Sequence, residues 1–158
     1  EKGVTKALDE GSLAGFPLVD LKVVLYDGSY HDVDSSGMSF EIASIQALKQ
    51  GLGDAEPVLL EPVVKLMVTV PDAYTGEVIS DLNVKRSRIL GMSPDNGVTQ
   101  IEADVPLAEV QRYAQDLRSV SHGRGTYSLE FDHYDQVPTN LEIKVIEEAK
   151  REKLAEAA

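Results

Sequence analysis

The sequence predicts an α+β protein with two small two-layer αβ domains, the second of them a ferredoxin-like βαββαβ unit. Over residues 61–134, hydrophobic periods typical of strands and helices alternate in the order β-α-β-β-α-β, which is the split βαβ arrangement. Residues 1–60 show one clear strand between two helices, and a single strand is too little sheet to bury both helices. We therefore expect the first domain to be an incomplete split βαβ-type unit, with earlier strands missing and the chain part of something larger.

The domain boundaries follow from turn residues and a change of pattern. The segment Glu56–Pro62 contains two prolines, which is typical of an extended connector between two units. A helical pattern begins again near Asn140. We therefore expect a first domain over residues 1–60, a second domain over 61–138, and a C-terminal helical tail over 139–158.

The first half begins with a short helix and a strand. Lys2–Glu10 places its apolar residues on one helical face, and Gly11 is expected to end that helix. After a turn at Gly15-Phe16-Pro17, the run Leu18–Tyr26 is rich in Leu and Val, which predicts a strand.

A longer helix follows in the first half. Its apolar residues recur at spacings of 4, 3, 3 and 4, which marks one helical face made of Met38, Ile42, Ile45, Leu48 and Leu52. Three neighbouring residues are suitable N-caps, namely Asp34, Ser35 and Ser36. We expect Gly51 and Gly53 to end the helix.

In the second half the hydrophobic period changes repeatedly, and each change marks a new element. Asn96-Gly97 is a strong tight-turn signal between two strands, and Pro106 suits the first turn of a helix. The predicted elements are, in order, a strand over Val63–Val70, a helix from Thr75 to about Lys85, strands over Ile89–Met92 and Val98–Val105, a helix carrying Leu107, Val110, Ala114 and Leu117, and a last strand around Tyr127–Asp132.

Composition excludes several classes of protein. Of the 158 residues, 42% are hydrophobic and 27% are charged, which is typical of a globular protein. No apolar run approaches the roughly 20 residues that span a bilayer, and no signal-peptide pattern opens the chain. The absence of cysteine excludes disulfides and fits a reducing compartment. The net charge of −12 argues against bulk attraction to nucleic acid, although a local basic patch stays open as an alternative.

A polar loop over residues 28–36 has three interpretations. His31 with Asp32 or Asp34 could ligate a metal or act as an acid–base pair, which would make the chain a small metal-dependent hydrolase. Neighbouring side chains on a short loop rarely converge, however, and no second ligand cluster supports them. The loop could equally be an ordinary helix-capping segment. The third interpretation is an exposed recognition loop in which Tyr30 and His31 stack on bases.

The densest basic run of the chain follows the second predicted unit's first helix. It contains Lys85, Arg86 and Arg88, and cations at such a position either form a solvated helix cap or contact phosphates. The glycines of Gly123-Arg124-Gly125 do not form the G-x-x-x-x-G-K-[ST] pattern, which occurs nowhere in the chain. The chain therefore has no P-loop, and no catalytic centre is predicted in it.

Longer motifs carry a resemblance to a known family. The segments Pro17–Asp20, Leu25–Ser36 and Pro57–Pro62 closely resemble the fourth domain of elongation factor G. Its fifth domain is resembled by Gly76–Asn83, Val105–Glu109, Asp116–Ser119, Gly123–Gly125 and Glu130–Tyr134. The resemblance covers about residues 1–148. Departures from the family pattern include Gly37, where Glu is usual, and Val84 and Ser87, which interrupt a run that is often richer in arginine.

The resemblance implies a function for the chain. It would be the ribosome-binding portion of a translational GTPase that promotes tRNA–mRNA translocation. GTP and Mg²⁺ are then expected in a GTPase domain outside this chain, which itself is expected to hold no cofactor, no metal and no catalytic residue. The expected partners are the ribosome (rRNA and stalk base), the tRNA–mRNA duplex and the GTPase half in cis, with no membrane, and the expected location is the cytoplasm.

The resemblance also assigns roles to residues. The tip loop that would reach the decoding centre, with His31 facing the codon–anticodon helix, consists of Ser29, Tyr30, His31, Asp32, Val33, Asp34, Ser35 and Ser36. The candidate rRNA contacts are Lys85, Arg86, Arg88 and Arg124. The departures leave the tip loop intact but keep a ribosome-recycling paralogue as an alternative. A module that binds only protein is a third reading.

Overall fold

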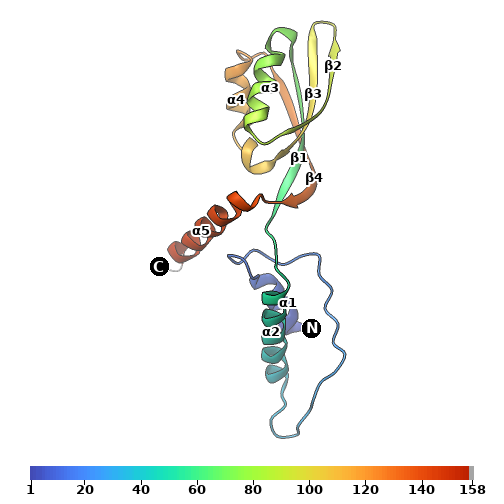
Figure 1. Ribbon diagram of the computed structural model, residues 1–158, viewed down its shortest axis with the longest axis vertical. Coiled ribbons are helices and arrows are strands. Elements are labelled where there is room, and N and C mark those ends of the chain that lie inside the picture. Colours follow the sequence, from blue (N-terminus) through green and yellow to red (C-terminus); the bar gives the residue numbers. More distant parts are fainter. Residues whose placement is uncertain (157–158) are drawn as a thin grey trace. The chain divides into compact units, whose positions relative to one another are not determined.

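A computed structural model describes residues 1–156 of the chain, which divides into two compact units (Figure 1). Unit 1 combines Glu1–Leu59 with Val137–Ala158, and unit 2 is Leu60–Gln136. The C-terminal helix, predicted to be a separate tail, is grouped with the N-terminal segment. None of the helices among the described residues is long and apolar enough to cross a membrane.

Unit 2 is a four-stranded antiparallel sheet with helices, and the predicted order β-α-β-β-α-β is confirmed. The strands lie in the order β2-β3-β1-β4, so the first and third strands form the centre of the sheet. Its elements are β1 (Leu60–Pro71), η1 (Asp72–Tyr74), α3 (Thr75–Val84), β2 (Arg88–Asp95), β3 (Val98–Pro106), η2 (Leu107–Val110), α4 (Tyr113–Val120) and β4 (Thr126–Gln136).

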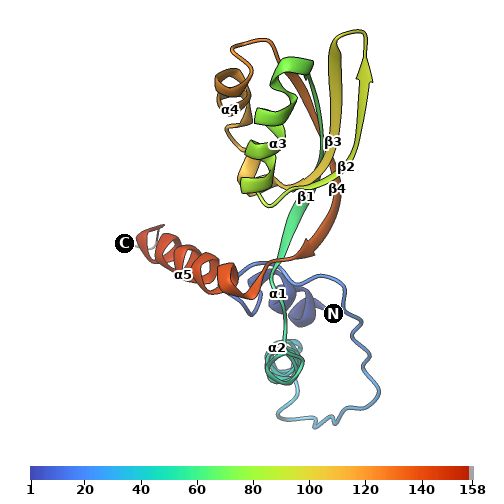
Figure 2. The same ribbon diagram turned by 45° about the horizontal axis from the view of Figure 1, so that its top comes forward.

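The core of unit 2 lies between the sheet and helices α3 and α4, which cover the same face (Figures 1 and 2). Burial alternates along strand β1, as expected for a strand with one covered face. Leu66 and Val68 are fully buried, while Met67 between them is half-exposed. The helices contribute Leu82 from α3 and Tyr113 from α4 to the same cluster, both fully buried. One face of the sheet is thus packed, and the other is open.

Unit 1 contains three helices in its described part: α1 (Lys2–Glu10), α2 (Gly37–Asp54) and α5 (Thr139–Glu156). Helix α1 packs against α2. Ser36 is the N-cap of α2, since its Oγ accepts a hydrogen bond from the Ser39 amide at 3.1 Å. Of the three candidate caps, Ser36 is therefore the one that is used.

The prediction of a strand over Leu18–Tyr26 is wrong. This segment belongs to a long loop between α1 and α2 that has no hydrogen-bonded ladder partner (Figures 1 and 2). Its residues have strand composition, but a strand exists only where a neighbouring chain satisfies its backbone groups. Leu25 and Tyr26 are 90% and 95% exposed as a result.

Two predictions for α2 are also wrong, namely the residue at which it ends and the burial of its whole apolar face. The helix continues through Gly51 and Gly53 to Asp54, because an interior glycine costs only about 1 kcal/mol and buried Leu52 anchors this turn. At the other end, Met38 is 73% exposed and Ile42 is half-exposed. No strand of the described part of unit 1 covers these two residues, so the apolar face that the spacing predicts is buried only toward its C-terminal end.

Candidate functional site

The tip loop Ser29–Ser36 is closed by its own hydrogen bonds. The Ser35 amide donates to the His31 carbonyl oxygen at 2.9 Å, and the His31 amide donates to Ser35 Oγ at 2.9 Å. Ser39 Oγ donates to the Asp34 carbonyl oxygen at 3.2 Å, which joins the turn to the first turn of α2. The backbone of this turn is therefore held by bonds within the loop and by one bond to α2.

The side chains of the tip loop are mostly exposed to solvent. All eight residues are exposed except Ser35, which is half-buried, and Val33 reaches 93% exposure. The Tyr30 ring lies parallel to the Phe40 ring of α2, with centroids 6.4 Å apart and an interplanar angle of 9°. The structure thus brings the predicted residues together in one exposed turn, which His31 and Ser35 close around Asp32, Val33 and Asp34.

The metal-site interpretation finds no support in the geometry. Among the described residues, no group of three or more His, Asp or Glu side chains is placed to hold a metal ion. The Ser35 hydroxyl and the His31 backbone are engaged with each other.

The basic run does not form a shared patch. Lys85 Nζ lies 2.7 Å from Asp116 Oδ2 and 3.6 Å from Asp81 Oδ1, so the lysine bridges α3 and α4. Arg88 is 75% exposed at its side chain, yet its Nη2 donates to Asp104 Oδ2 at 2.7 Å. Hydrogen bonds to Asp104 raise the pKa of Arg88. Each of these cations is thus paired with a carboxylate of unit 2.

Arg86 is the most heavily paired of the three cations. Its Nη1 and Nη2 donate to the two carboxylate oxygens of Glu61 at 2.7 Å and 2.9 Å. Its Nε donates to Glu109 Oε1 at 2.8 Å. These bonds, first those to Glu61, raise the pKa of the guanidinium above its already high ordinary value.

Sequence reasoning named Arg124 but missed Arg112, the N-cap residue of α4, and Arg118 in its last turn. Within the described residues, Arg112, Arg118 and Arg124 have no ion-pair partner, and all three are exposed. The exposed residues of α4 and its flanking turns are Gln111, Arg112, Ala114, Gln115, Arg118, Ser119, His122, Gly123 and Arg124, and none of them is an acid. Asp116 of α4 is partly exposed, but its carboxylate is paired with Lys85. The helical period of this segment, with Tyr113 and Leu117 inward, would have shown the acid-free outer face.

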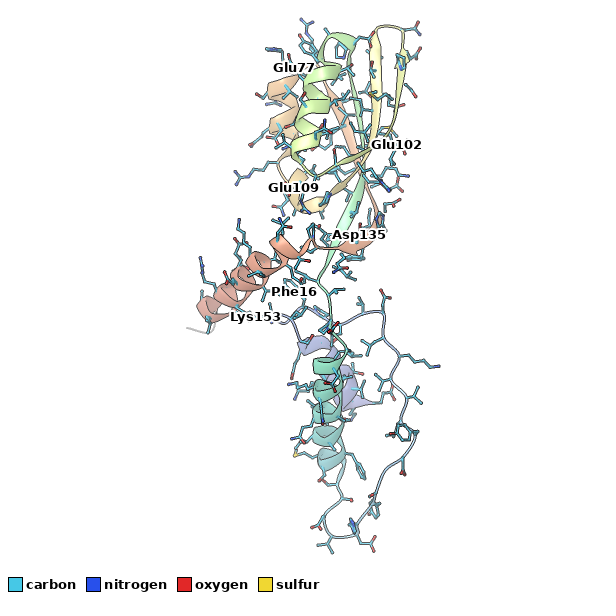
Figure 3. All side chains as sticks on the ribbon, in the orientation of Figure 1. Phe16, Glu77, Glu102, Glu109, Asp135 and Lys153 are labelled. Carbon is cyan, nitrogen blue, oxygen red and sulfur yellow. The ribbon has the colours of Figure 1, made fainter. Side chains whose placement is uncertain are left out.

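The open face of the sheet carries a row of alternating charges. Lys65 of β1 is in register with Asp104 of β3 on one side and with Glu130 of β4 on the other, and Arg88 of β2 is in register with Asp104. Lys65 Nζ also lies 3.6 Å from Glu102 Oε1, and Figure 3 shows Glu102 beside the sheet. Opposite charges in neighbouring strands neutralise one another, so this face offers no net attraction to a phosphate backbone.

The aromatic residues of β4 do not lie on the open face. Tyr127 and Phe131 are in register with Val68 and Val64, whose side chains are buried beneath the helices. Stacking of bases on the open sheet, as RNA-binding sheets do it, requires exposed aromatic rings on that face. Among the described residues of unit 2, the arginines without an ion-pair partner therefore lie in and around α4 and not on the open face of the sheet.

Asp81 belongs to the bridge between α3 and α4, but its carboxylate is only partly paired. Its Oδ2 is buried without a hydrogen-bond partner, and its Oδ1 lies 3.6 Å from Lys85 Nζ. Burial raises the pKa of this carboxyl above its ordinary value, and the nearby Asp116 charge adds to that rise while Lys85 opposes it. Desolvation thus outweighs the attraction of the lysine at this position.

We expect Asp81→Asn to reduce the fall in stability of unit 2 as the pH rises. Because the folded-state pKa is raised, the carboxyl contributes stability that is fully present below its unfolded value near 3.8 and is lost as the pH rises through the folded value. The amide cannot ionise, so the variant should be more stable relative to the wild type from about pH 4 upward. Urea denaturation at several pH values measures this difference. Asp95→Asn, on the exposed β2–β3 hairpin, is the control. A relative loss at neutral pH would show that the Lys85 attraction dominates.

Comparison with known proteins gives two family matches. The family described as "Elongation factor G, domain IV" matches residues 1–56, and the family described as "Elongation factor G C-terminus" matches residues 58–144. A solved crystal structure of a Thermus thermophilus protein, described there only as ttk003000868, is similar at 43% identity and a TM-score of 0.85. The match covers 95% of this chain and 23% of the Thermus chain, so this chain spans about a quarter of that protein's length.

Proposed function

Because the chain belongs to the elongation factor G family, we propose that it is the ribosome-docking part of a longer translational GTPase that promotes tRNA–mRNA translocation. The two matched domains do not include the GTPase domain of that family. GTP and Mg²⁺ would therefore bind to a domain outside this chain, and the work of this chain would be mechanical. The factor would act in the cytoplasm, where translation takes place.

The tip loop carries this proposal. A turn closed by the hydrogen bonds between His31 and Ser35 can enter a crowded site without first being ordered there. The exposed His31 imidazole and Tyr30 ring are surfaces on which bases stack. We assign this turn to the decoding centre, where it would contact the tRNA–mRNA duplex and block the return of tRNA after translocation.

Single-round translocation tests the role of the tip loop. The chain is fused to the GTPase-bearing half of an established factor, and His31→Ala is compared with the unchanged fusion. We expect the variant to be slower by about tenfold, since a stacked base is worth about 1–3 kcal/mol. Lys22→Ala, in the exposed loop before the tip, is the matched control and should translocate at the unchanged rate.

Each outcome of this test decides between readings. Equal rates for His31→Ala and the unchanged fusion would remove the tip loop from the mechanism. A folded fusion that splits ribosomes but does not translocate would identify the recycling paralogue. A fusion that is folded but inactive in both assays would contradict the proposal as a whole.

The acid-free side of α4 supports a second ribosomal contact. We assign Arg118 and Arg124 to phosphates of large-subunit rRNA near the stalk base, because these exposed arginines have no carboxylate partner among the described residues. Arg88 could join them only by exchanging Asp104 for a phosphate. Lys85 and Arg86 are held between elements of unit 2 and are the weakest candidates of the original four.

The salt dependence of binding tests this second contact. The slope of log K against log salt concentration is negative, and its magnitude should fall by about 0.8 for each phosphate contact that Arg118→Gln or Arg124→Gln removes. Binding of the 158-residue chain to a stalk-base rRNA fragment, measured between about 50 and 300 mM KCl, gives that slope. Lys65→Gln removes one cation from the open sheet face and should leave the slope unchanged. A slope that changes equally in all three variants would show non-specific attraction only.

A further inference from the structure

Arg86 occupies an unusual position at the junction between α3 and β2. Its φ of 55° lies in the left-handed region, which is unfavourable for a residue that carries a Cβ. Arg86 directly follows the C-cap Lys85 of α3, where helices commonly end in the left-handed region, and the next amide, that of Ser87, donates to the Leu82 carbonyl oxygen at 3.3 Å. All three guanidinium nitrogens of Arg86 donate hydrogen bonds, two to Glu61 and one to Glu109.

The two carboxylates come from segments far from Arg86 in the sequence. Glu61 lies at the start of β1, and Glu109 lies in η2, which joins β3 to α4 (Figure 3). Their side chains are 14% and 33% exposed, and that of Arg86 is 28% exposed, so the group is largely withdrawn from solvent. Charge-assisted bonds in such a setting are strong and directional. Arg86 therefore ties together three connections at one end of unit 2.

Helix α4 begins close in the sequence to this group. Only Gln111 and Arg112 separate η2 from the first residue of α4, and Val110 at the end of η2 is buried in the core. We propose that Arg86 is a positioning residue that holds η2 through Glu109 and thereby sets the placement of the arginine-bearing side of α4. This inference rests on the proposed contact between α4 and rRNA for its functional consequence, while the clamp itself is a property of the free chain.

The rival interpretation is that Arg86 contacts rRNA directly. A substitution at Glu109 distinguishes the two interpretations. Removing a negative charge next to an RNA-binding surface strengthens binding when only charge matters. Removing Glu109 from a clamp weakens binding, because η2 and the start of α4 lose their anchor. Glu109→Gln therefore has opposite effects under the two readings. Arg86→Lys is similarly informative, since lysine keeps the charge but cannot donate to both carboxylates as a fork.

The experiment combines amide hydrogen exchange of the free chain with rRNA binding. We expect Glu109→Gln and Arg86→Lys each to speed exchange over residues 107–113 by about tenfold, which is the loss of one charge-assisted bond. Both should weaken binding to the stalk-base rRNA fragment by about threefold to tenfold while leaving the salt slope at its wild-type value. Arg118→Gln is the control, with a lower slope and unchanged exchange.

The outcomes separate this inference from the proposed function. Unchanged exchange in both variants would overturn the clamp, as would tighter rRNA binding by Glu109→Gln. A lower salt slope in Arg86→Gln, comparable to that of Arg118→Gln, would establish Arg86 as a direct phosphate contact instead. If the wild-type chain binds no rRNA but the two variants exchange faster, the clamp stands and the proposed rRNA contact fails.

Discussion

Leu66→Ala is expected to destabilise unit 2 by about 3–5 kcal/mol, which approaches the whole stability of many small domains. Leu66 lies in the central strand β1, is fully buried, and belongs to the cluster formed by the sheet with α3 and α4. Its neighbours come from several elements that cannot all move inward, so the truncation should leave a cavity. Urea denaturation followed by near-ultraviolet circular dichroism measures the change.

Met67→Ala is the matched control for Leu66→Ala. Met67 is the next residue of the same strand, but its side chain is on the open face, where it is half-exposed. We expect its truncation to cost about 1 kcal/mol or less. Comparable losses at the two positions would contradict the assignment of the packed and open faces, because successive residues of a strand point to opposite sides.

Gly3→Ala is expected to loosen the packing of α1 against α2 and to cost about 1–3 kcal/mol of local stability. A Cβ at position 3 would overlap Ser44 Oγ and the Glu41 carbonyl oxygen, and it would lie 3.0 Å from Glu41 Cα. A backbone oxygen cannot swing aside as a flexible side chain can, so the two helices must separate. Amide exchange of α1 in the free chain should become faster.

Lys6→Ala provides the comparison for Gly3→Ala. Lys6 lies in the same helix on its exposed side, so its truncation should leave exchange in α1 nearly unchanged. Unchanged exchange in Gly3→Ala would show that α1 does not approach α2 through its glycine. Equal acceleration in both variants would show that the effect does not come from the contact at Gly3, since alanine is the better helix former at both positions.

The sequence predicted unit 2 well because its signals are local. Each of its strands and helices has a hydrophobic period of its own, and Asn96-Gly97 marks the hairpin between β2 and β3. The residues of the tip loop could be named in the same way, since a polar run before a helix can be read from the sequence. The α4 face escaped prediction although its signal is also local, because its arginines are dispersed along the chain and the densest basic run lies elsewhere.

Three features were decided only by the tertiary structure. The segment Leu18–Tyr26 has strand composition but no ladder partner. A strand needs backbone hydrogen bonds from a second segment, and the sequence of one segment does not reveal whether that partner is present. Helix α2 continues past two glycines because burial of Leu52 compensates their low propensity. The cations of the basic run face carboxylates 16 to 31 residues away, at Glu61, Asp104, Glu109 and Asp116.

The order of elements in unit 2 and the family resemblance were thus determined by the sequence alone, since each depends on neighbours along the chain. Whether a cation is free or paired was determined by the fold. Arg86 and Arg118 look alike in the sequence, yet one is enclosed by two glutamates and the other has no acid beside it on the outer face of α4. A charge acts over a few ångströms of space, and only packing decides which distant residues come that close.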